Sequence, residues 1–276
     1  MRNLTEENLT EAVLARLARA ENPRFKEIMT SVIRHLHAVV REVGLTEAEW
    51  AEAIKSLTST GHKCDGDRQE FILLSDVLGV SMLVDAINHR KPAGATESTV
   101  LGPFYIEGAP DLPPGFDISH GGPGEPTEVS GHVLMPDGKP ITGAVLDVWQ
   151  TAPNGFYSTQ DPNQDRFNLR GRFRSDAKGA FSFRTIKPTS YPVPTDGPVG
   201  VVLNAMGRHP MRPAHLHFIV SAPRFETLTT HLFVEGDPYL DSDVVFGVKN
   251  SLIVPFKPKP DGKMLQATYD FGLSPL

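Results

Sequence analysis

The pattern of apolar residues changes near residue 100, and this change constrains the fold more than any other feature of the chain. Before it, apolar residues recur at spacings of three and four, which is the period of a helix with one buried face. After it, short segments alternate with turns rich in glycine and proline, a pattern typical of a β-sandwich or barrel. The sequence therefore predicts an α+β protein, with a helical region over 1–100 and an all-β region, a β-sandwich, over 101–276.

Four helices are expected in the first region. The strongest signal is an apolar stripe over 25–43, and Thr46 with Glu49 forms a capping box for the helix that follows it. A weaker helix is expected over 5–20. A fourth, over 69–88, is apolar almost all round, so we expect it to be buried on most sides.

At least eight short strands are expected after an irregular connection over 92–126. Tight turns at 136–139 and 176–179 predict two hairpins. The expected strands are 127–134, 141–150, 169–174, 180–186, 199–205, 214–221, 229–235 and 266–271.

Composition excludes several classes of protein. A net charge of −6 with no run of basic residues gives no signal for nucleic acid or anionic lipid as a partner. No stretch approaches the roughly 20 apolar residues that span a bilayer, and the acidic N-terminal segment is not a signal peptide. The single cysteine, Cys64, leaves no internal disulfide and suits a reducing compartment. We expect a cytoplasmic protein.

Two histidines one residue apart, His215 and His217, give the first sign of chemistry. They lie in an apolar run that reads as a strand, so both side chains are expected on one face, with Leu216 and Phe218 on the other. Two imidazoles in this arrangement can bind a single metal ion. The alternative is a pair of structural histidines near a strand end.

Further ligands would decide which metal this pair binds. A carboxylate would complete the ferrous triad of two histidines and one carboxylate, and three ligands with an open position would suit a hydrolytic zinc. The sequence also offers Tyr157 and Tyr191, each just beyond an expected strand end. Tyrosine becomes an anionic ligand only beside a strong Lewis acid such as ferric iron. A tyrosine at such a position, taken alone, is more often a strand-end aromatic than a ligand.

An ordered set of motifs extends beyond these four residues. The chain resembles the intradiol ring-cleavage dioxygenases, the catechol 1,2-dioxygenase superfamily. The resemblance runs from Phe71 to Lys249, and its motifs are LGPFY at 101–105, GAVLDVWQ at 143–150, GFY at 155–157, NLRGR at 168–172, YPVPTDGP at 191–198, GRHP at 207–210 and RPAHLH at 212–217.

The resemblance implies a role for each residue of the expected site. Tyr157, Tyr191, His215 and His217 match the ligands of one Fe(III) per subunit, and Arg212 matches an arginine over the substrate ring. The substrates implied are a small aromatic ortho-diol and O2, with Tyr191 taking a proton from the diol. The N-terminal helices resemble a linker that joins two subunits into a homodimer and encloses bound phospholipid.

The resemblance also places a substrate pocket, and Asp76 is the unusual residue in it. A carboxylate on an apolar helix is costly to bury unless it has a partner, so it either pairs within the protein or accepts a hydrogen bond from a third ring hydroxyl. The second reading favours hydroxyquinol (1,2,4-trihydroxybenzene), cleaved to 3-hydroxy-cis,cis-muconate, which tautomerises to maleylacetate. His231, in place of a glutamine of catechol-cleaving members, also weakens the catechol reading. The expected pocket residues are Leu73, Asp76, Val100, Leu101, Gly102, Pro103, Phe104, Val193, Pro194, Arg212 and Val245.

Other functions remain open at this level. Catechol and chlorocatechol are alternative substrates. A non-enzymatic β-sandwich that binds aromatic ligands or carbohydrate is a more remote alternative, and a zinc hydrolase would leave the two tyrosines without a role.

Overall fold

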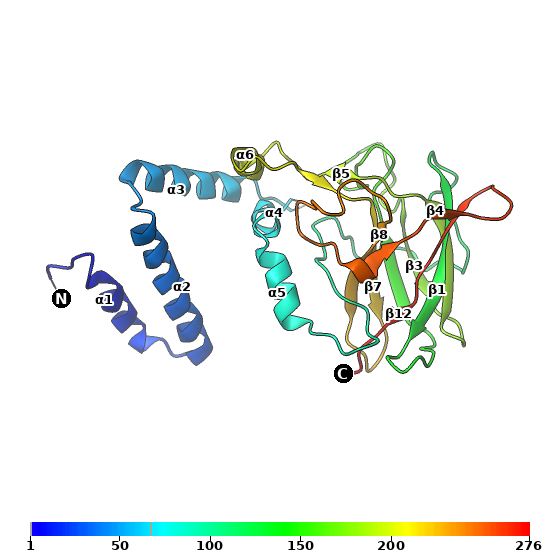
Figure 1. The fold of residues 1–276 in the computed structure, drawn as a ribbon, viewed down its shortest axis with the longest axis horizontal. Coiled ribbons are helices and arrows are strands. Elements are labelled where there is room, and N and C mark those ends of the chain that lie inside the picture. The colour runs from blue at the N-terminus through cyan, green and yellow to red at the C-terminus, as the bar shows by residue number, and fades with distance from the viewer. Residues whose placement is uncertain (1, 67) are drawn as a thin grey trace. The chain divides into compact units, whose positions relative to one another are not determined.

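The computed structural model describes residues 2–66 and 68–276, and the chain divides into two compact units, one up to Ser59 and one from Thr60. The first unit is helical and the second combines helices with strands, as Figure 1 shows along the colour gradient. The α+β prediction is confirmed. The functional division at residue 100 stays a prediction.

The first unit consists of helices whose ends follow from the local sequence. α2 begins where the Asn22 side chain accepts a hydrogen bond from the Phe25 N–H at 3.0 Å. The capping box forms as predicted, because the Thr46 N–H donates to Glu49 and the Glu49 N–H donates back to the Thr46 hydroxyl. The elements are α1 (Leu9–Arg16), η1 (Leu17–Arg19), α2 (Pro23–Glu42) and α3 (Glu47–His62), the last of which runs into the second unit.

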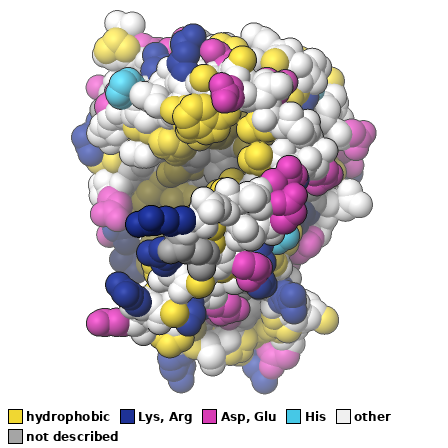
Figure 2. All heavy atoms as spheres, turned by 90° about the vertical axis from the view of Figure 1, so that its left-hand side faces the viewer, with side chains coloured by type: hydrophobic (Ala, Val, Ile, Leu, Met, Phe, Trp, Pro, Cys, Tyr) yellow, Lys and Arg dark blue, Asp and Glu magenta, His cyan; other side chains and the backbone are white. Residues whose placement is uncertain are grey.

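The apolar stripe of α2 is exposed in the single chain. Phe25, Leu36 and Val43 are 54%, 61% and 62% exposed. Figure 2 shows one face of the molecule, where apolar side chains reach the surface beside charged side chains of both signs. No helix among the described residues is long and apolar enough to cross a bilayer.

The predicted helix over 69–88 is two helices, α4 (Glu70–Val77) and α5 (Val80–Asn88). Gly79 separates them, because its φ of +74° lies in the left-handed region that favours glycine. The expected burial on most sides was also wrong. Leu73 and Val77 pack inward, but Phe71 is 46% exposed, and Leu83 and Val84 on the outer face of α5 are 62% and 53% exposed.

The strands form a β-sandwich. One sheet has the order β10-β11-β1-β12, with β4 paired to β1, and the second has the order β3-β2-β7-β8-β9. The remaining pair is β5-β6. Their bounds are β1 Pro126–Leu134, β2 Val145–Trp149, β3 Arg170–Arg174, β4 Ala180–Ile186, β5 Tyr191–Pro192, β6 Met211–Arg212, β7 His215–Ser221, β8 Leu228–Val234, β9 Ile253–Val254, β10 Lys257–Pro258, β11 Leu265–Thr268 and β12 Phe271–Gly272, with η2 at Asn250–Leu252.

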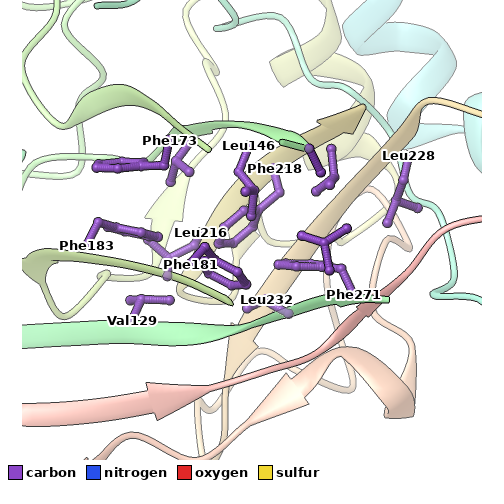
Figure 3. Packing of buried hydrophobic residues seen from close by; sticks show 14 of the residues in the cluster. Val129, Leu146, Phe173, Phe181, Phe183, Leu216, Phe218, Leu228, Leu232 and Phe271 are labelled. Carbon is purple, nitrogen blue, oxygen red and sulfur yellow. The ribbon is translucent and has the colours of Figure 1, made fainter. Parts of the chain in front are cut away.

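Aliphatic and aromatic side chains together fill the space between the two five-stranded sheets (Figure 3). Phe173 stacks on Phe183 with ring centroids 4.9 Å apart, and Phe218 lies 4.9 Å from Phe271. Each pair joins a strand of one sheet to a strand of the other. The inner faces are therefore occupied by the core, and the outer face of the second sheet is available for chemistry.

Residues 199–205 form a helix, α6 (Pro198–Ala205), and the predicted strand there is wrong. Pro198 occupies the first turn, where its missing N–H costs nothing. Val199 and Leu203, four residues apart, are buried while Val201 is 68% exposed, which is a helical period. The valine-rich composition concealed that period.

Both predicted hairpins are also wrong, although both turns form. The Met135 N–H donates to the Lys139 carbonyl, and the Gly179 N–H donates to the Asp176 carbonyl. However, β1 and β2 lie in different sheets, as do β3 and β4. Turn residues reverse the chain locally, but the packing of the two sheets decides which strand each one pairs with.

Candidate active site

His215 and His217 lie together on the outer face of the second sheet. The alternation along β7 places Leu216 and Phe218 in the sandwich core and both imidazoles on the opposite side, as predicted. Both histidines are buried, and their Nε2 atoms are 3.1 Å apart.

The two tyrosines meet this histidine pair. Tyr157 follows the turn after β2, and Tyr191 lies on β5. The Tyr157 hydroxyl is 3.1 Å from the Tyr191 hydroxyl and 2.8 Å from His217 Nε2. Phe104 stacks on the Tyr157 ring with centroids 4.6 Å apart, which fixes that ring. Four donor atoms from three separate segments thus converge on one buried point.

The protonation of these groups suits a metal. His215 Nδ1 lies 2.7 Å from the Pro213 carbonyl, which only accepts, so Nδ1 carries the proton and Nε2 presents a lone pair. Burial lowers the pKa of His215 and His217 well below the ordinary value, which keeps both imidazoles neutral. Burial raises the pKa of Tyr157 well above its ordinary value, so its oxygen becomes anionic only if a strong Lewis acid binds it.

A third buried imidazole, His231, lies beside the pair. It is directly opposite His217 on β8, and the two rings are 4.2 Å apart and nearly perpendicular. Thr99 Oγ1 lies 3.0 Å from its Nδ1, while its Nε2 is buried without a hydrogen-bond partner. The sequence linked His231 only to the choice of substrate and did not predict its place beside the histidine pair, because that place depends on the register of β7 and β8.

Arg212 is held by an ion pair that the sequence did not predict. Tyr191 and Arg212 are opposite each other across β5 and β6. The Arg212 guanidinium donates to both carboxylate oxygens of Asp243, at 3.1 and 3.3 Å, and lies 3.3 Å from His215 Nε2. Burial opposes the charge, but the Asp243 carboxylate raises the pKa of Arg212 above its ordinary value. The site therefore contains a permanent cation.

A cavity of about 480 Å³ opens beside the donor atoms, and Tyr191 and Arg212 line it. All the expected pocket residues line this cavity except Leu101, which is 43% exposed. Asp76 is 3% exposed, and burial raises the pKa of its carboxyl group. Phe156, Thr159 and Gln160 also line the cavity and were not expected.

Charged residues surround one part of this cavity. Arg68 Nη1 bonds Asp196 at 2.8 Å, and Lys63 bonds the same carboxylate at 2.9 Å. Hydrogen bonds from Lys63 and Arg68 lower the pKa of Asp196 to about 2. These residues are far apart in sequence, so no local pattern predicts their association.

The donor set fits ferric iron better than the alternatives. Two phenol oxygens and two imidazole nitrogens converge, and the cluster of metal-binding side chains found among the described residues adds His231 but no carboxylate. Phenolate oxygens are hard donors that match a trivalent ion. His217 presents its Nε2 to this cluster, 2.8 Å from the Tyr157 hydroxyl and 3.1 Å from His215 Nε2.

Comparison with known proteins agrees with this geometry. A family model described as "Catechol dioxygenase N terminus" matches residues 22–96, and one described as "Dioxygenase" matches residues 100–275. The chain belongs to the intradiol ring-cleavage dioxygenases, a family dependent on non-haem iron. The resemblance drawn from the sequence motifs is confirmed.

Within this family, the chain is similar over most of its length to proteins named as hydroxyquinol or 6-chlorohydroxyquinol dioxygenases. The chain is 53% identical over 275 residues to a 6-chlorohydroxyquinol 1,2-dioxygenase of Cupriavidus pinatubonensis, with 100% of this chain and 99% of that protein covered. A hydroxyquinol 1,2-dioxygenase of Rhizobium sp. is 54% identical over 262 residues, covering 95% and 89%. The solved structure of a hydroxyquinol 1,2-dioxygenase from Pseudomonas putida matches with a TM-score of 0.93 at 53% identity, covering 98% and 99%.

Proposed function

We propose that this protein is an Fe(III) intradiol dioxygenase that inserts both atoms of O2 into hydroxyquinol. The product would be 3-hydroxy-cis,cis-muconate, which tautomerises to maleylacetate. The observation that carries the proposal is the convergence of the Tyr157, Tyr191, His215 and His217 donor atoms within 2.8 to 3.1 Å of their neighbours in the cluster. Ferric iron held there would supply a Lewis acid that favours the doubly deprotonated diol.

Each protein group then has a task that its position supports. Tyr191 lines the cavity and is the ligand placed to take a proton from the diol. Arg212, held by Asp243, offsets negative charge that develops on the substrate ring. The walls at Val100, Phe104 and Val245 are apolar and exclude water, which strengthens this electrostatic effect.

The choice of hydroxyquinol over catechol rests on Asp76 and on the named relatives. Asp76 lines the cavity from α4, and its carboxylate can accept a hydrogen bond from a third ring hydroxyl. A pocket with such an acceptor discriminates against a ring that lacks the donor, since the buried carboxylate then keeps only its hydrogen bond with Ser81. The similarity to a 6-chlorohydroxyquinol 1,2-dioxygenase makes a chlorinated hydroxyquinol the second candidate substrate.

Colour and oxygen uptake test this proposal together. Purified protein loaded with iron should absorb in the visible through charge transfer from tyrosinate to iron. Oxygen uptake should be fastest with hydroxyquinol or its 6-chloro derivative and slower with catechol and chlorocatechols. A colourless protein that binds no iron would contradict the metal site, whereas a coloured protein that prefers catechol would contradict only the substrate.

We also propose that two copies associate through the N-terminal helices. Apolar side chains line α2 and the outer face of α5 and are exposed in one chain, for example Leu36 at 61% and Leu83 at 62%. A second copy and a bound phospholipid would cover such surfaces. Light scattering would give the mass of the particle, and organic extraction followed by mass spectrometry would identify the lipid. A monomeric wild-type protein would contradict the proposal, and Leu36→Asp should weaken a dimer.

A further inference from the structure

Arg170 is a buried cation that the proposed reaction does not use. It lies on β3 within the NLRGR motif and is only 2% exposed. Its Nε donates to the Ser158 hydroxyl at 2.9 Å, while its Nη2 is buried without a hydrogen-bond partner. Among the described residues, no carboxylate lies within ion-pair distance of its guanidinium.

Asp147 is the carboxylate that acts electrostatically on Arg170, but its side chain accepts a hydrogen bond from another residue. The Tyr105 hydroxyl donates to Asp147 at 3.0 Å. Burial lowers the pKa of Arg170 to about 10, so the guanidinium still carries its charge at neutral pH. Burying a charge without a counterion is strongly unfavourable, and proteins rarely keep such a group unless an anion forms nearby.

Tyr157 is positioned to supply that anion. The Arg170 guanidinium carbon is 5.9 Å from the centre of the Tyr157 ring. Strand register places Arg170 opposite Trp149, Trp149 opposite His217, and His217 opposite His231, so a single row across four strands joins the arginine to the histidines. All four side chains therefore lie on the outer face of the second sheet.

We propose that Arg170 is a positioning residue that acts through Tyr157 and serves as the fixed counter-cation for its phenolate oxygen. A metal held by Tyr157 would take its oxygen as a phenolate, with the phenol proton released to solvent. The negative charge formed then offsets the buried guanidinium. The buried cation thereby favours binding of a metal that takes the Tyr157 oxygen in its deprotonated form. This inference rests on the proposed ferric site.

Two variants separate the charge of Arg170 from its packing. Arg170→Lys keeps the charge and Arg170→Gln removes it, while both keep a donor for Ser158. Arg172→Gln is the matched control, because Arg172 lies two residues along the same strand but faces Asp111, 3.6 Å away. Metal-free protein of each kind would be titrated with Fe(III) citrate, with thermal unfolding as the check on folding.

The charge predicts a definite order among these proteins. Arg170→Gln should bind Fe(III) about 10- to 100-fold more weakly, the range seen when groups that support metal ligands are lost. Its charge-transfer band should move to longer wavelength, because a phenolate that keeps Arg212 but loses the second cation, Arg170, gives up electron density more easily. Arg170→Lys and Arg172→Gln should resemble the wild type in both measurements.

Three results would overturn or redirect the inference. Lys and Gln variants with the same affinity and band would show that the charge has no role. A Gln variant that matches the wild type would show the same. If Arg170→Gln fails to fold, Arg170→Met replaces the cation with an apolar chain and repeats the comparison with Arg170→Lys. A wild-type protein without any band would instead contradict the ferric site itself.

Discussion

Gly102 lies directly against the His217 ring. A Cβ atom at position 102 would come within 3.3 Å of His217 Cε1, and the φ of Gly102 is +75°. Glycine is therefore required twice at this point, once for its backbone conformation and once for the space beside the ring. The loop at Gly102, which lines the cavity, therefore contacts His217, a proposed metal ligand, directly.

Gly102→Ala should displace His217 and reduce the iron content of the protein. Left-handed backbone strain alone costs about 1–2 kcal/mol of unfolding free energy. Gly108→Ala provides the control, because Gly108 has a φ of +84° and nothing within 4 Å of an added Cβ. Both variants should unfold at lower denaturant concentration, but only Gly102→Ala should lose iron and visible absorbance. Equal iron content in the two variants would contradict the coupling.

The parts of the site that the sequence predicted are those that local geometry determines. His215 and His217 share a face because a strand alternates, whatever the rest of the fold does. The ligand roles of the two tyrosines and the substrate role of Arg212 were predicted from the motifs of the family, because no local geometry indicates them. The strand predicted in place of α6 and the two predicted hairpins were wrong. Apolar composition and turn residues do not indicate which other segment a given segment packs against.

The missing parts of the site depend on contacts between distant segments. Asp243 pairs with Arg212 across 31 residues, and Arg68 pairs with Asp196 across 128. His231 meets His217 only through the register of two strands. The exposed apolar faces of α4 and α5 were predicted as buried because the sequence pattern records that a face is covered, but not whether the same chain covers it.

Asp243→Asn should destabilise the protein because it leaves Arg212 as an uncompensated buried charge. Both side chains of this pair are at most 4% exposed. Removing one partner of such a pair typically costs about 3–5 kcal/mol of unfolding free energy. Urea denaturation would measure the loss. Asp137→Asn breaks the exposed pair with Lys139 and should leave the urea midpoint unchanged. Similar midpoints for the two variants would contradict the importance of the buried pair.

The three buried histidines predict that metal-free protein loses stability in mild acid. Burial lowers the pKa of His215, His217 and His231 well below 6.5, so the unfolded chain binds protons first as the pH falls. Their contribution is fully present above pH 6.5 and declines below it. Each histidine then contributes a loss of about 1.4 kcal/mol per pH unit.

Urea unfolding at pH 7.5 and pH 5.5 would measure this loss. His231→Gln removes one of the three groups and should reduce the difference between the two pH values by about a third, while contributions from other groups cancel. A difference that is the same in wild type and His231→Gln would show that His231 is not kept neutral by burial.

Asp76→Ala should reduce turnover of hydroxyquinol far more than turnover of catechol. A hydrogen bond to a charged group is worth about 1.5–3 kcal/mol, so kcat/KM for hydroxyquinol should fall about 10- to 150-fold. Catechol has no third hydroxyl and loses no such bond. Ser81→Ala is the matched control, because Ser81 hydrogen-bonds the Asp76 carboxyl and its loss leaves the acceptor in place. Steady-state oxygen uptake with both diols gives the two ratios. Equal losses on hydroxyquinol and catechol would mean that Asp76 serves the structure of α4, and the choice of substrate would then have to come from the apolar walls.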